Sequence, residues 1–398
     1  MTQDRDLYNG REQTYIKHVF LRRYLEGLAI KVLAGGWDAF NYVDGFAGPW
    51  NTRDNEGFTD ASFGLAVDLL ETVRKFVEKR SGRNLKVRFF LCEKNSEAVV
   101  RLREFAENQT GLEIHVFEGA FEDNLDAISA RIPNGFTFTF IDPTNWVVRI
   151  EDVCEFLKAK RGEFLFNFMT EEVSRHSVNP KVANQFGALV GDPDWQETAK
   201  SLPEGMRGEL KVLHLLKEAF RNRVGILFLP DFSILKPLAH REKMRLMLGT
   251  DSPEGLKLFR DTQAKVEGEE FKSRRQAKTE KTRQDMLFSE EDFAKYEQGE
   301  RGVGCKRYKR LTEERVLKIL SSGYPSRFSE IAVDVMEELP MKETHVKDVL
   351  KEMRDAGKVS YELEGRAWKP NAGTIIFAGE HSGISPRRDS DAADEIPW

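Results

Sequence analysis

The stretch Asn41-Tyr42-Val43-Asp44-Gly45-Phe46-Ala47-Gly48-Pro49-Trp50 decides the fold, because an apolar run meets an acid there and continues into a turn of small residues. The residues before Asp44 have the aromatic and β-branched character of a buried strand, and the acid falls where a parallel strand would end. The glycines and the alanine after it let the backbone approach a ligand. Since open α/β sheets bind ligands beyond the carboxyl ends of their strands, we expect a ligand cradle here. The competing interpretation is a tight strand-to-helix turn with a solvated acid.

Strand and helix patterns alternate along the chain after this stretch. Residues 86–93 have an apolar strand pattern that ends in Glu93, and residues 136–141 have another that ends in Asp142-Pro143. The other predicted strands are residues 113–118 and 164–169, and the predicted helices are residues 15–33, 61–79 with Ser62 as N-cap, 96–108, 121–131 and 151–160. Five strands alternating with helices predict a doubly wound, Rossmann-like sheet that is mostly parallel.

An α/β domain over residues 1–255 is expected to depart from this alternation in its last third. Residues 171–223 have an irregular helical pattern, which indicates a helical insertion. Residues 224–229 and 244–249 are apolar strand patterns without a full helix between them. We therefore expect an antiparallel pair at one edge of the sheet.

Three segments follow the α/β domain. Residues 256–305 are charged and helical in pattern, and we interpret them as a connector. Residues 306–370 predict a winged helix, with three helices and a hairpin that turns at Glu364-Gly365. The polar residues 371–398 are expected to be a largely disordered tail. The connector has a basic run that is either a solvated helix face or a surface that contacts phosphates, and its members are Lys272, Arg274, Arg275, Lys278, Lys281 and Arg283.

The charge of the predicted winged helix bears on its role. Residues 311–369 contain 10 Lys and Arg against 12 Asp and Glu, which gives a net charge of −2. Phosphate contacts supply much of the affinity of DNA-reading helices, and these require a positive field. The composition therefore favours a protein-contact or packing role over DNA reading.

The whole chain has 398 residues and a net charge of −5, so its overall charge does not indicate a nucleic-acid partner. Its three cysteines, Cys92, Cys154 and Cys305, are far apart and form no ligand pattern for zinc. The sequence has no signal peptide and no apolar run near 18 residues. We expect a cytoplasmic protein with reduced thiols, two or three domains and no membrane segment.

Acids recur after the predicted strands, at Asp44, Glu93, Asp123 and Asp142. In a doubly wound sheet these ends line one cleft, although each acid is alternatively a cap of the following helix. Glu93, at the end of the second strand, is placed to accept hydrogen bonds from ribose hydroxyls. No glycine run offers a pyrophosphate cradle, and carboxylates attract the cationic amino group and sulfonium of S-adenosyl-L-methionine. The pattern therefore favours S-adenosylmethionine over a dinucleotide.

Four segments are similar to the bacterial three-Cys-motif partner family, TcmP: residues 42–49, 61–66, 90–93 and 140–143. The resemblance spans most of residues 17–255. It implies a class I methyltransferase-like sheet similar to that of adenine-N6 methyltransferases, and a separate radical-S-adenosylmethionine-like iron–sulfur partner with three cysteines. By position it implies cofactor binding by Asp44, Phe46, Ala47, Gly48 and Glu93, with Asp142 and Pro143 opening the catalytic motif.

The sequence departs from that family's pattern at two places. The family often has glycine where Trp50 stands, and an indole there would narrow the methionine end of the pocket. Adenine-N6 enzymes have Asp-Pro-Pro-aromatic, whereas this chain has Asp142-Pro143-Thr144-Asn145-Trp146. Trp146 either stacks on an acceptor base, one residue out of register, or packs at the sheet edge.

Three functions are compatible with these residues. The first is a methyltransferase acting on a nucleic-acid base or a modified small molecule, with Asp142 and Trp146 at the acceptor. The second is a non-catalytic methyltransferase-like scaffold for the iron–sulfur partner, and the third is a DNA-binding regulator. Residues at and after the end of the fifth strand either bind substrate or form a plain loop; these are Asn167, Glu171, Glu172, Arg175 and His176.

Overall fold

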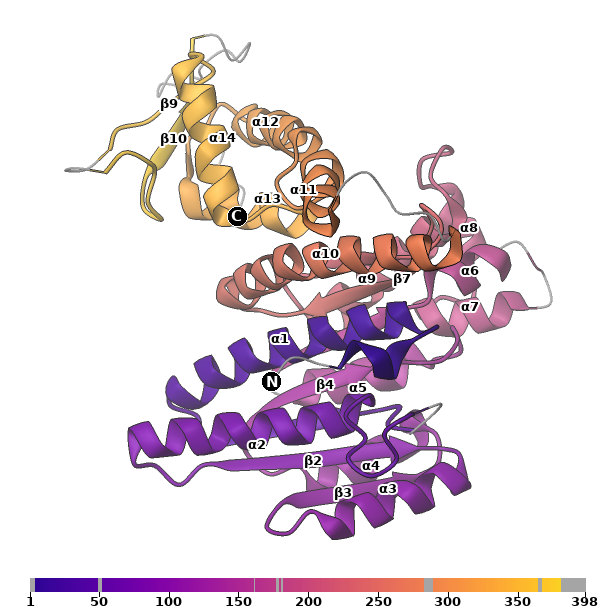
Figure 1. Cartoon of the computed structure of the whole chain (residues 1–398). Coiled ribbons are helices and arrows are strands. Elements are labelled where there is room, and N and C mark those ends of the chain that lie inside the picture. The colour runs from indigo at the N-terminus through magenta and orange to yellow at the C-terminus, as the bar shows by residue number, and fades with distance from the viewer. Residues whose placement is uncertain are drawn as a thin grey trace, which may run out of the picture. The chain divides into compact units, whose positions relative to one another are not determined.

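The computed structural model describes residues 4–48, 52–160, 162–176, 179, 182–282, 289–363 and 367–380 (Figure 1). The chain divides into two compact units. The N-terminal unit comprises Met1–Thr262 and Glu269–Leu287, and the C-terminal unit comprises Gln263–Gly268 and Phe288–Trp398. Each unit is described by itself below.

A seven-stranded sheet forms the centre of the N-terminal unit, with strand order β3-β2-β1-β4-β5-β7-β6. Strands β1 to β5 are parallel, while β7 is antiparallel to both of its neighbours, β5 and β6. The strands are β1 (Ala39–Asp44), β2 (Lys86–Glu93), β3 (Glu113–Glu118), β4 (Phe136–Ile141), β5 (Gly162–Phe168), β6 (Asp231–Leu235) and β7 (Glu242–Gly249). This is the predicted doubly wound, mostly parallel fold of the Rossmann-like methyltransferase type.

Helices cover both faces of this sheet. One face packs on a core of apolar residues drawn from α4, α5, α7 and α9, while Tyr24 of α1 packs on Phe138 of the other face. The helices before β6 are α1 (Glu12–Ala34), α2 (Ser62–Ser81), α3 (Ser96–Asn108), α4 (Phe121–Arg131), α5 (Ile150–Ala159), α6 (Thr170–His176), α7 (Ala183–Val190), α8 (Trp195–Lys200) and α9 (Gly208–Val224), preceded by the short 3-10 helix η1 (Arg5–Tyr8). The predicted helical insertion therefore consists of α6 to α9.

The first strand of the predicted edge pair was misplaced. Residues 224–229 do not form it, because Val224 is the last residue of α9 and Gly225 caps that helix with a φ of +83°. Phe228 makes one isolated bridge to Thr250, and the regular ladder with β7 begins at Asp231, after Pro230. The apolar residues 224–229 thus end helix α9 and contact the sheet before the strand begins.

The segment predicted as a charged connector begins with a helix that packs on the sheet. Helix α10 (Pro253–Thr282) buries Phe259 against Phe20 of α1, and Arg260 is fully buried beside them. Within the basic run, the buried Arg274 donates hydrogen bonds to the carbonyl oxygens of Lys236 and Ala239. For Arg274, neither of the two expected roles applies. Arg283 lies outside the described residues.

The C-terminal unit combines helices with a small antiparallel sheet. Strand β10 lies between β8 and β9 and is antiparallel to both. Its elements are α11 (Glu290–Arg301), α12 (Lys306–Leu320), β8 (Ser326–Arg327), α13 (Phe328–Glu338), α14 (Glu343–Asp355), β9 (Val359–Ser360) and β10 (Ile375–Ala378). Helix α14 packs through a buried apolar face on α12 and α13.

The predicted hairpin was wrong in its second strand. The partner of β9 is β10, which does not follow the predicted turn directly, so the connection between the two strands is longer than a tight turn. Strand β10 also lies beyond residue 370, in a segment predicted to be tail. The predicted turn at Glu364-Gly365 and residues 381–398 lie outside the described residues.

None of the helices in the described part of the chain has both the length and the apolar character needed to cross a membrane. The three cysteines are buried, and all of them are free thiols.

Gly64→Ala is expected to lower the free energy of unfolding by about 1–3 kcal/mol, the usual cost of overpacking. A Cβ at Gly64 would lie 2.3 Å from the carbonyl oxygen of Phe58, and backbone cannot move aside as a flexible side chain can. Urea unfolding measures the change. Gly268→Ala is the matched control, because a Cβ there meets open space on a helix and should be neutral or stabilising. Equal stability of Gly64→Ala and the wild-type protein would contradict this close approach.

Candidate active site

The strand register brings three of the predicted acids to one edge of the sheet, here called the carboxyl edge. Asp44 ends the central strand β1 and lies opposite Leu91 of β2 and Phe140 of β4. Glu93 and Asp142 each come two residues after these partners. The carboxyl groups of β2, β1 and β4 therefore follow one another along the edge, as expected for parallel strands.

Asp44 is completely buried, and both of its carboxylate oxygens have partners. Oδ2 accepts hydrogen bonds from Ser62 Oγ at 2.7 Å and from the Tyr42 hydroxyl at 3.2 Å, while Oδ1 accepts one from the Phe46 amide at 3.1 Å. Burial raises the pKa of Asp44 to about 6, although the hydrogen bonds from Ser62 and Phe46 oppose the rise. Asp44 thus fixes the start of the following loop.

The loop after β1 uses its own amides internally. The Gly45 amide donates to the Phe140 carbonyl at 3.0 Å, the Ala47 amide donates to the Cys92 carbonyl at 2.8 Å, and the Phe46 amide donates to Asp44. The backbone that was expected to approach a ligand therefore has no spare amide at Gly45, Phe46 or Ala47. Three amides that are already satisfied cannot form an anion-binding nest for a pyrophosphate.

Side-chain packing also shapes this loop. A Cβ at Gly45 would lie 2.8 Å from the ring of Phe121, and Phe46 packs on the same ring at a centroid distance of 6.0 Å. Gly48 is the last described residue of the loop. Pro49 and Trp50 lie outside the described residues, so the expectation that Trp50 narrows the pocket stays a prediction.

Glu93 keeps one carboxylate oxygen available at the carboxyl edge. Its Oε1 accepts a hydrogen bond from the Asn95 amide at 2.7 Å, which orients the side chain. Its Oε2 makes no hydrogen bond to any residue that the structure describes, although only 5% of Glu93 is exposed. A carboxylate held in this way can accept hydrogen bonds from a pair of ligand hydroxyls.

Asp142 lies in a small polar cluster with Lys17 and Asn167. Lys17 Nζ forms an ion pair with Oδ2, and Asn167 Nδ2 donates to Oδ1 at 2.6 Å. The side-chain oxygen of Asn167 is buried and has no hydrogen-bond partner among the described residues. Pro143 is buried directly after Asp142. The cluster offers a carboxylate and an unused acceptor oxygen side by side, which suits an amine-bearing ligand.

Trp146 packs on the helical insertion. Its ring lies 5.4 Å from Phe186, nearly parallel to it, and 4.7 Å from the imidazole of His176. Its indole N–H donates to Gln185 Oε1 at 3.2 Å. Of the two roles open to Trp146, this geometry favours packing over stacking on an acceptor base.

Asp123 is not brought together with the other three acids by any described contact. It forms an ion pair with Arg149 at 2.6 Å, and 63% of its side chain is exposed. It also lines a groove of about 370 Å³ with residues of α4 and α5. A cofactor role for Asp123 stays a prediction.

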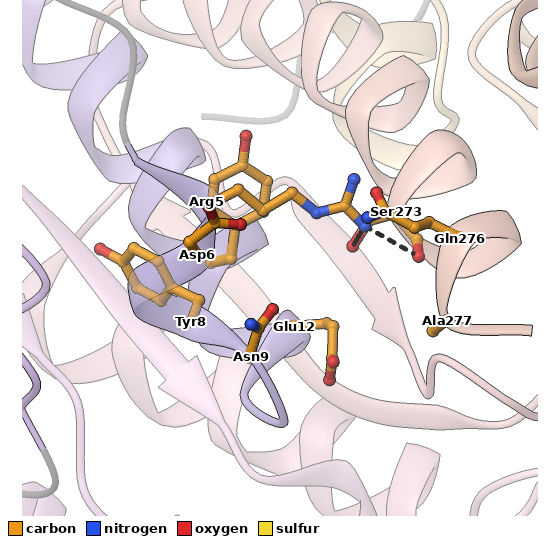
Figure 2. A pocket seen from close by; sticks show the side chains of 9 residues that line it. Arg5, Asp6, Tyr8, Asn9, Glu12, Ser273, Gln276 and Ala277 are labelled. Carbon is orange, nitrogen blue, oxygen red and sulfur yellow. Dashed lines mark hydrogen bonds between the residues drawn. The ribbon is translucent and has the colours of Figure 1, made fainter. Parts of the chain in front are cut away.

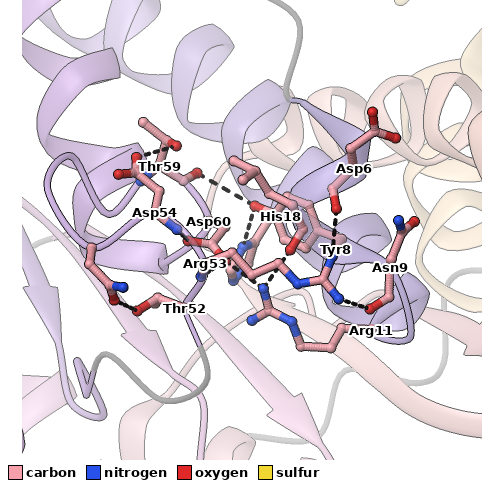
Figure 3. Close-up of polar contacts among 12 residues, drawn as sticks. Asp6, Tyr8, Asn9, Arg11, His18, Thr52, Arg53, Asp54, Thr59 and Asp60 are labelled. Carbon is pink, nitrogen blue, oxygen red and sulfur yellow. Dashed lines mark hydrogen bonds and ion pairs between the residues drawn. The ribbon is translucent and has the colours of Figure 1, made fainter.

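An N-terminal network, shown in Figure 3, connects η1 and α1 to the loop before α2. Asp60 is buried, pairs with Arg11 and accepts a hydrogen bond from the Arg53 amide at 2.9 Å. The Arg53 guanidinium donates to the carbonyls of Asp6 and Asn9, both at 2.8 Å (Figure 3). The loop that leads into Ser62 and the segment that leads into Lys17 are therefore held together.

His18 belongs to the same network. Its Nδ1 lies 3.0 Å from the Tyr8 hydroxyl (Figure 3). Burial lowers the pKa of His18 well below its usual value, and the nearby charges of Lys17 and Arg11 act in the same direction. The imidazole is therefore neutral at physiological pH. Its contact with Tyr8 fixes the part of α1 that contains Lys17.

A pocket between η1, α1 and α10, shown in Figure 2, is too small to be a ligand site. It holds about 10 Å³, the space of about one water molecule, and Arg5 spans it with hydrogen bonds to Ser273 (Figure 2).

Several solved structures have weak similarity to this chain. A DUF519 protein from Legionella pneumophila matches with 12% identity over 62% of this chain and 89% of its own, with a TM-score of 0.36. A putative caffeoyl-CoA O-methyltransferase from Staphylococcus aureus has 9% identity over 57% and 80%, with a TM-score of 0.28. The methyltransferase domain of a citrinin polyketide synthase has 16% identity over 54% and 46%, also with a TM-score of 0.28. No family model and no curated protein sequence matches the chain.

Two site residues were missed by sequence reasoning. Ser62 was predicted to cap α2, but Ala61 is the N-cap, and the Ser62 hydroxyl donates to Asp44 instead. Lys17 was assigned no role. No pattern in the sequence identifies it, and its role is seen only from its burial in α1 next to the buried His18.

Asp44→Asn is expected to be more stable than the wild-type protein at pH 7.5 and to lose this advantage below about pH 4. Folded Asp44 keeps its proton up to a pKa of about 6, whereas the unfolded chain releases it near 3.8. Folding of the wild-type protein therefore becomes less favourable as pH rises between these values, by up to about 3 kcal/mol, and this penalty persists above pH 6. Thermal melts from pH 3.5 to 8 measure the difference. A difference that is constant with pH would contradict the raised pKa.

Proposed function

We propose that the chain is an S-adenosylmethionine-dependent methyltransferase of the three-Cys-motif partner type. The observation that carries this proposal is the pairing of an available Glu93 oxygen with a neighbouring loop whose amides at residues 45–47 are already bonded. A ribose-bearing ligand without a pyrophosphate fits both features. S-adenosylmethionine has a ribose and no phosphate, and it supplies an electrophilic methyl group when bound.

The residues of the site have separable roles in this proposal. Glu93 binds the ribose hydroxyls through Oε2. Asp44 is a positioning residue, since its buried carboxylate holds the loop rather than facing a ligand. Asp142 and Asn167 orient the acceptor, because they present oxygen acceptors together. Methyl transfer depends mainly on such alignment of acceptor and donor.

Lys17 also belongs to the acceptor side of the site. Its ammonium group occupies Asp142 Oδ2, the position at which an acceptor amine would be held. An acceptor that uses this oxygen must therefore share or displace Lys17. A nucleic-acid base with an exocyclic amine, or a small molecule with an amine, is the acceptor that this polar cluster suits.

Glu93→Ala is expected to weaken S-adenosylmethionine binding at least tenfold, since each charge-assisted hydrogen bond contributes roughly 1.5–3 kcal/mol. Isothermal titration calorimetry measures the change. The matched control is Glu118→Ala, which removes an acid from the end of the neighbouring strand β3, where the side chain is 42% exposed and paired with Arg103. Unchanged affinity in Glu93→Ala would show that the ribose assignment is wrong.

A second candidate function is a methyltransferase-like scaffold for an iron–sulfur partner. The C-terminal unit favours it through large apolar side chains that are exposed on and near its small sheet, namely Trp368 at 67%, Phe377 at 47% and Ile375 at 37%. Exposed apolar groups of this kind are typical of protein contacts. Those of strand β10, Ile375 and Phe377, alternate along it and so lie on one face.

Asp142→Asn distinguishes the two functions. If the chain is an enzyme, this variant should retain S-adenosylmethionine affinity and lose at least a hundredfold in methyl transfer, because the charge that orients the acceptor is gone. Transfer of tritiated methyl groups from S-adenosylmethionine to total RNA, DNA and small-molecule fractions measures this. Asp152→Asn, an exposed acid of α5, is the control. If the wild-type protein binds S-adenosylmethionine and transfers no methyl group to any fraction, the scaffold function is favoured.

A further inference from the structure

Four cations surround a single buried carboxylate just after β5. Glu171 is 1% exposed at its side chain, and all four approach it. Arg175 lies 2.5 Å and Arg241 3.4 Å from Oε1, which Lys236 also contacts, and Lys243 lies 2.8 Å from Oε2. We call these four residues the cationic cluster. Burial raises the pKa of Glu171, but hydrogen bonds from Lys236 and Lys243 outweigh it and lower the pKa to about 2.

The cationic cluster has more positive charge than its carboxylates neutralise. Glu172 is the second acid in contact with it, 3.2 Å from Arg175 and 3.9 Å from Lys243. Two carboxylates against four cations leave an excess of two positive charges. Arg241 and Arg175 are also 58% and 51% exposed at their side chains, so both guanidinium groups reach solvent.

The turn that supplies Lys236 and Arg241 is held in place by side chains of α10. The Lys236 amide donates to the Arg241 carbonyl at 2.9 Å, which closes the turn between β6 and β7. Buried Arg274 of α10 donates to two carbonyls of this turn, and Glu270 accepts from the Leu235 amide at 2.7 Å. The cations are therefore presented by an anchored turn.

The cationic cluster lies at the carboxyl edge, close to Asp142. Strand β6 ends and β7 begins at this edge, and Glu171 follows β5 there. Strand β5 separates β4, which leads into Asp142, from β7. Two strand spacings amount to roughly 10 Å. A ligand of one or two nucleotides can span that distance.

We propose that the cationic cluster binds the phosphate groups of a nucleic-acid acceptor whose reactive base lies at Asp142. This inference rests on the proposed methyltransferase function and adds the acceptor's class to it. Arginine matches phosphate oxygens in a two-pronged geometry, and lysine acts as a point charge. Phosphate contacts position a strand without reading its sequence. The negative net charge of the chain therefore does not prevent binding, because the positive field is local.

Arg175→Gln/Arg241→Gln tests the cationic cluster with little risk to folding. Both side chains are exposed, and Glu171 keeps its contacts with Lys236 and Lys243. Fluorescence anisotropy of the full chain with labelled 20-nucleotide single-stranded RNA and DNA measures affinity from 50 to 300 mM salt. The double variant is expected to bind at least tenfold more weakly. The slope of log affinity against log salt should also fall by about 1.4, since each lost phosphate contact contributes roughly 0.7 on a single strand.

Lys31→Gln/Lys75→Gln is the matched control, because it removes the same charge elsewhere. Lys31 lies 14 residues along α1 from Lys17, and Lys75 lies 13 residues along α2 from Ser62, so both are about 20 Å from the carboxyl edge. The control is expected to bind like the wild-type protein. The proposal is overturned if the Arg175/Arg241 variant binds within twofold of the wild-type protein, or if the control loses as much affinity.

Inorganic phosphate and adenosine monophosphate serve as competitors to identify the source of the phosphate. Weak competition at millimolar concentration is expected from both. If they bind and the oligonucleotides do not, the nucleic-acid assignment is wrong. Oligonucleotide binding that depends on the cluster, with no methyl transfer, would support the inference and count against the proposed activity; calorimetric binding of S-adenosylmethionine without oligonucleotide binding would do the reverse.

Discussion

The buried carboxylate of Asp44 is the constraint on which the rest of the carboxyl edge depends. It ends the central strand, and its hydrogen bonds reach α2 through Ser62, the strand itself through Tyr42, and the following loop through the Phe46 amide. Burying an acid is costly unless it is hydrogen-bonded, and here burial still raises its pKa to about 6. This unfavourable burial has a structural use, because the hydrogen bonds from Ser62, Tyr42 and the Phe46 amide fix where the loop leaves the sheet.

Helix α1 extends this order to Asp142. Lys17 and His18 are adjacent on the helix and buried, and they point to different partners, Asp142 and Tyr8. The neutral imidazole is fixed by η1, and η1 is in turn fixed by Arg53. A displacement of η1 would therefore be transmitted to Asp142 through the adjacent residues His18 and Lys17. This links the N-terminal segment to the site although it provides no predicted site residue.

Local patterns in the sequence predicted the fold well where each pattern belongs to a single helix or strand. Strands β2, β3 and β4 were predicted to the residue, because each is a short apolar run between clear turns. Prediction failed where one apolar run belongs to two elements. Residues 224–229 are such a run, because they end helix α9 before they approach the sheet. The second strand of the predicted hairpin was misplaced for a related reason, since a nearby two-residue turn signal outweighed the distant β10.

The acids of the candidate site and Asn167 could be predicted from the sequence, but the other parts of the site could not. Glu93 and Asp142 follow strands whose ends can be identified locally, so their common edge follows from the fold class. Lys17 is 125 residues away from Asp142 in sequence, and no periodicity links them. The availability of amides could not be predicted either, because the Ala47 amide is satisfied by a carbonyl of another strand.

Charge is divided along the carboxyl edge in a way that suits two ligands of opposite sign. The acids Asp44, Glu93 and Asp142 lie at β1, β2 and β4, whereas the cationic cluster lies beyond β5. The sulfonium of the proposed cofactor would be attracted to the acidic half, and phosphates would be repelled from it and attracted to the cationic half. Glu171 keeps the four cations together, because without a buried carboxylate their mutual repulsion would separate them. If the proposed function holds, this separation of charge would orient a nucleic-acid acceptor with its phosphates at β7 and its base toward Asp142, as methyl transfer would require.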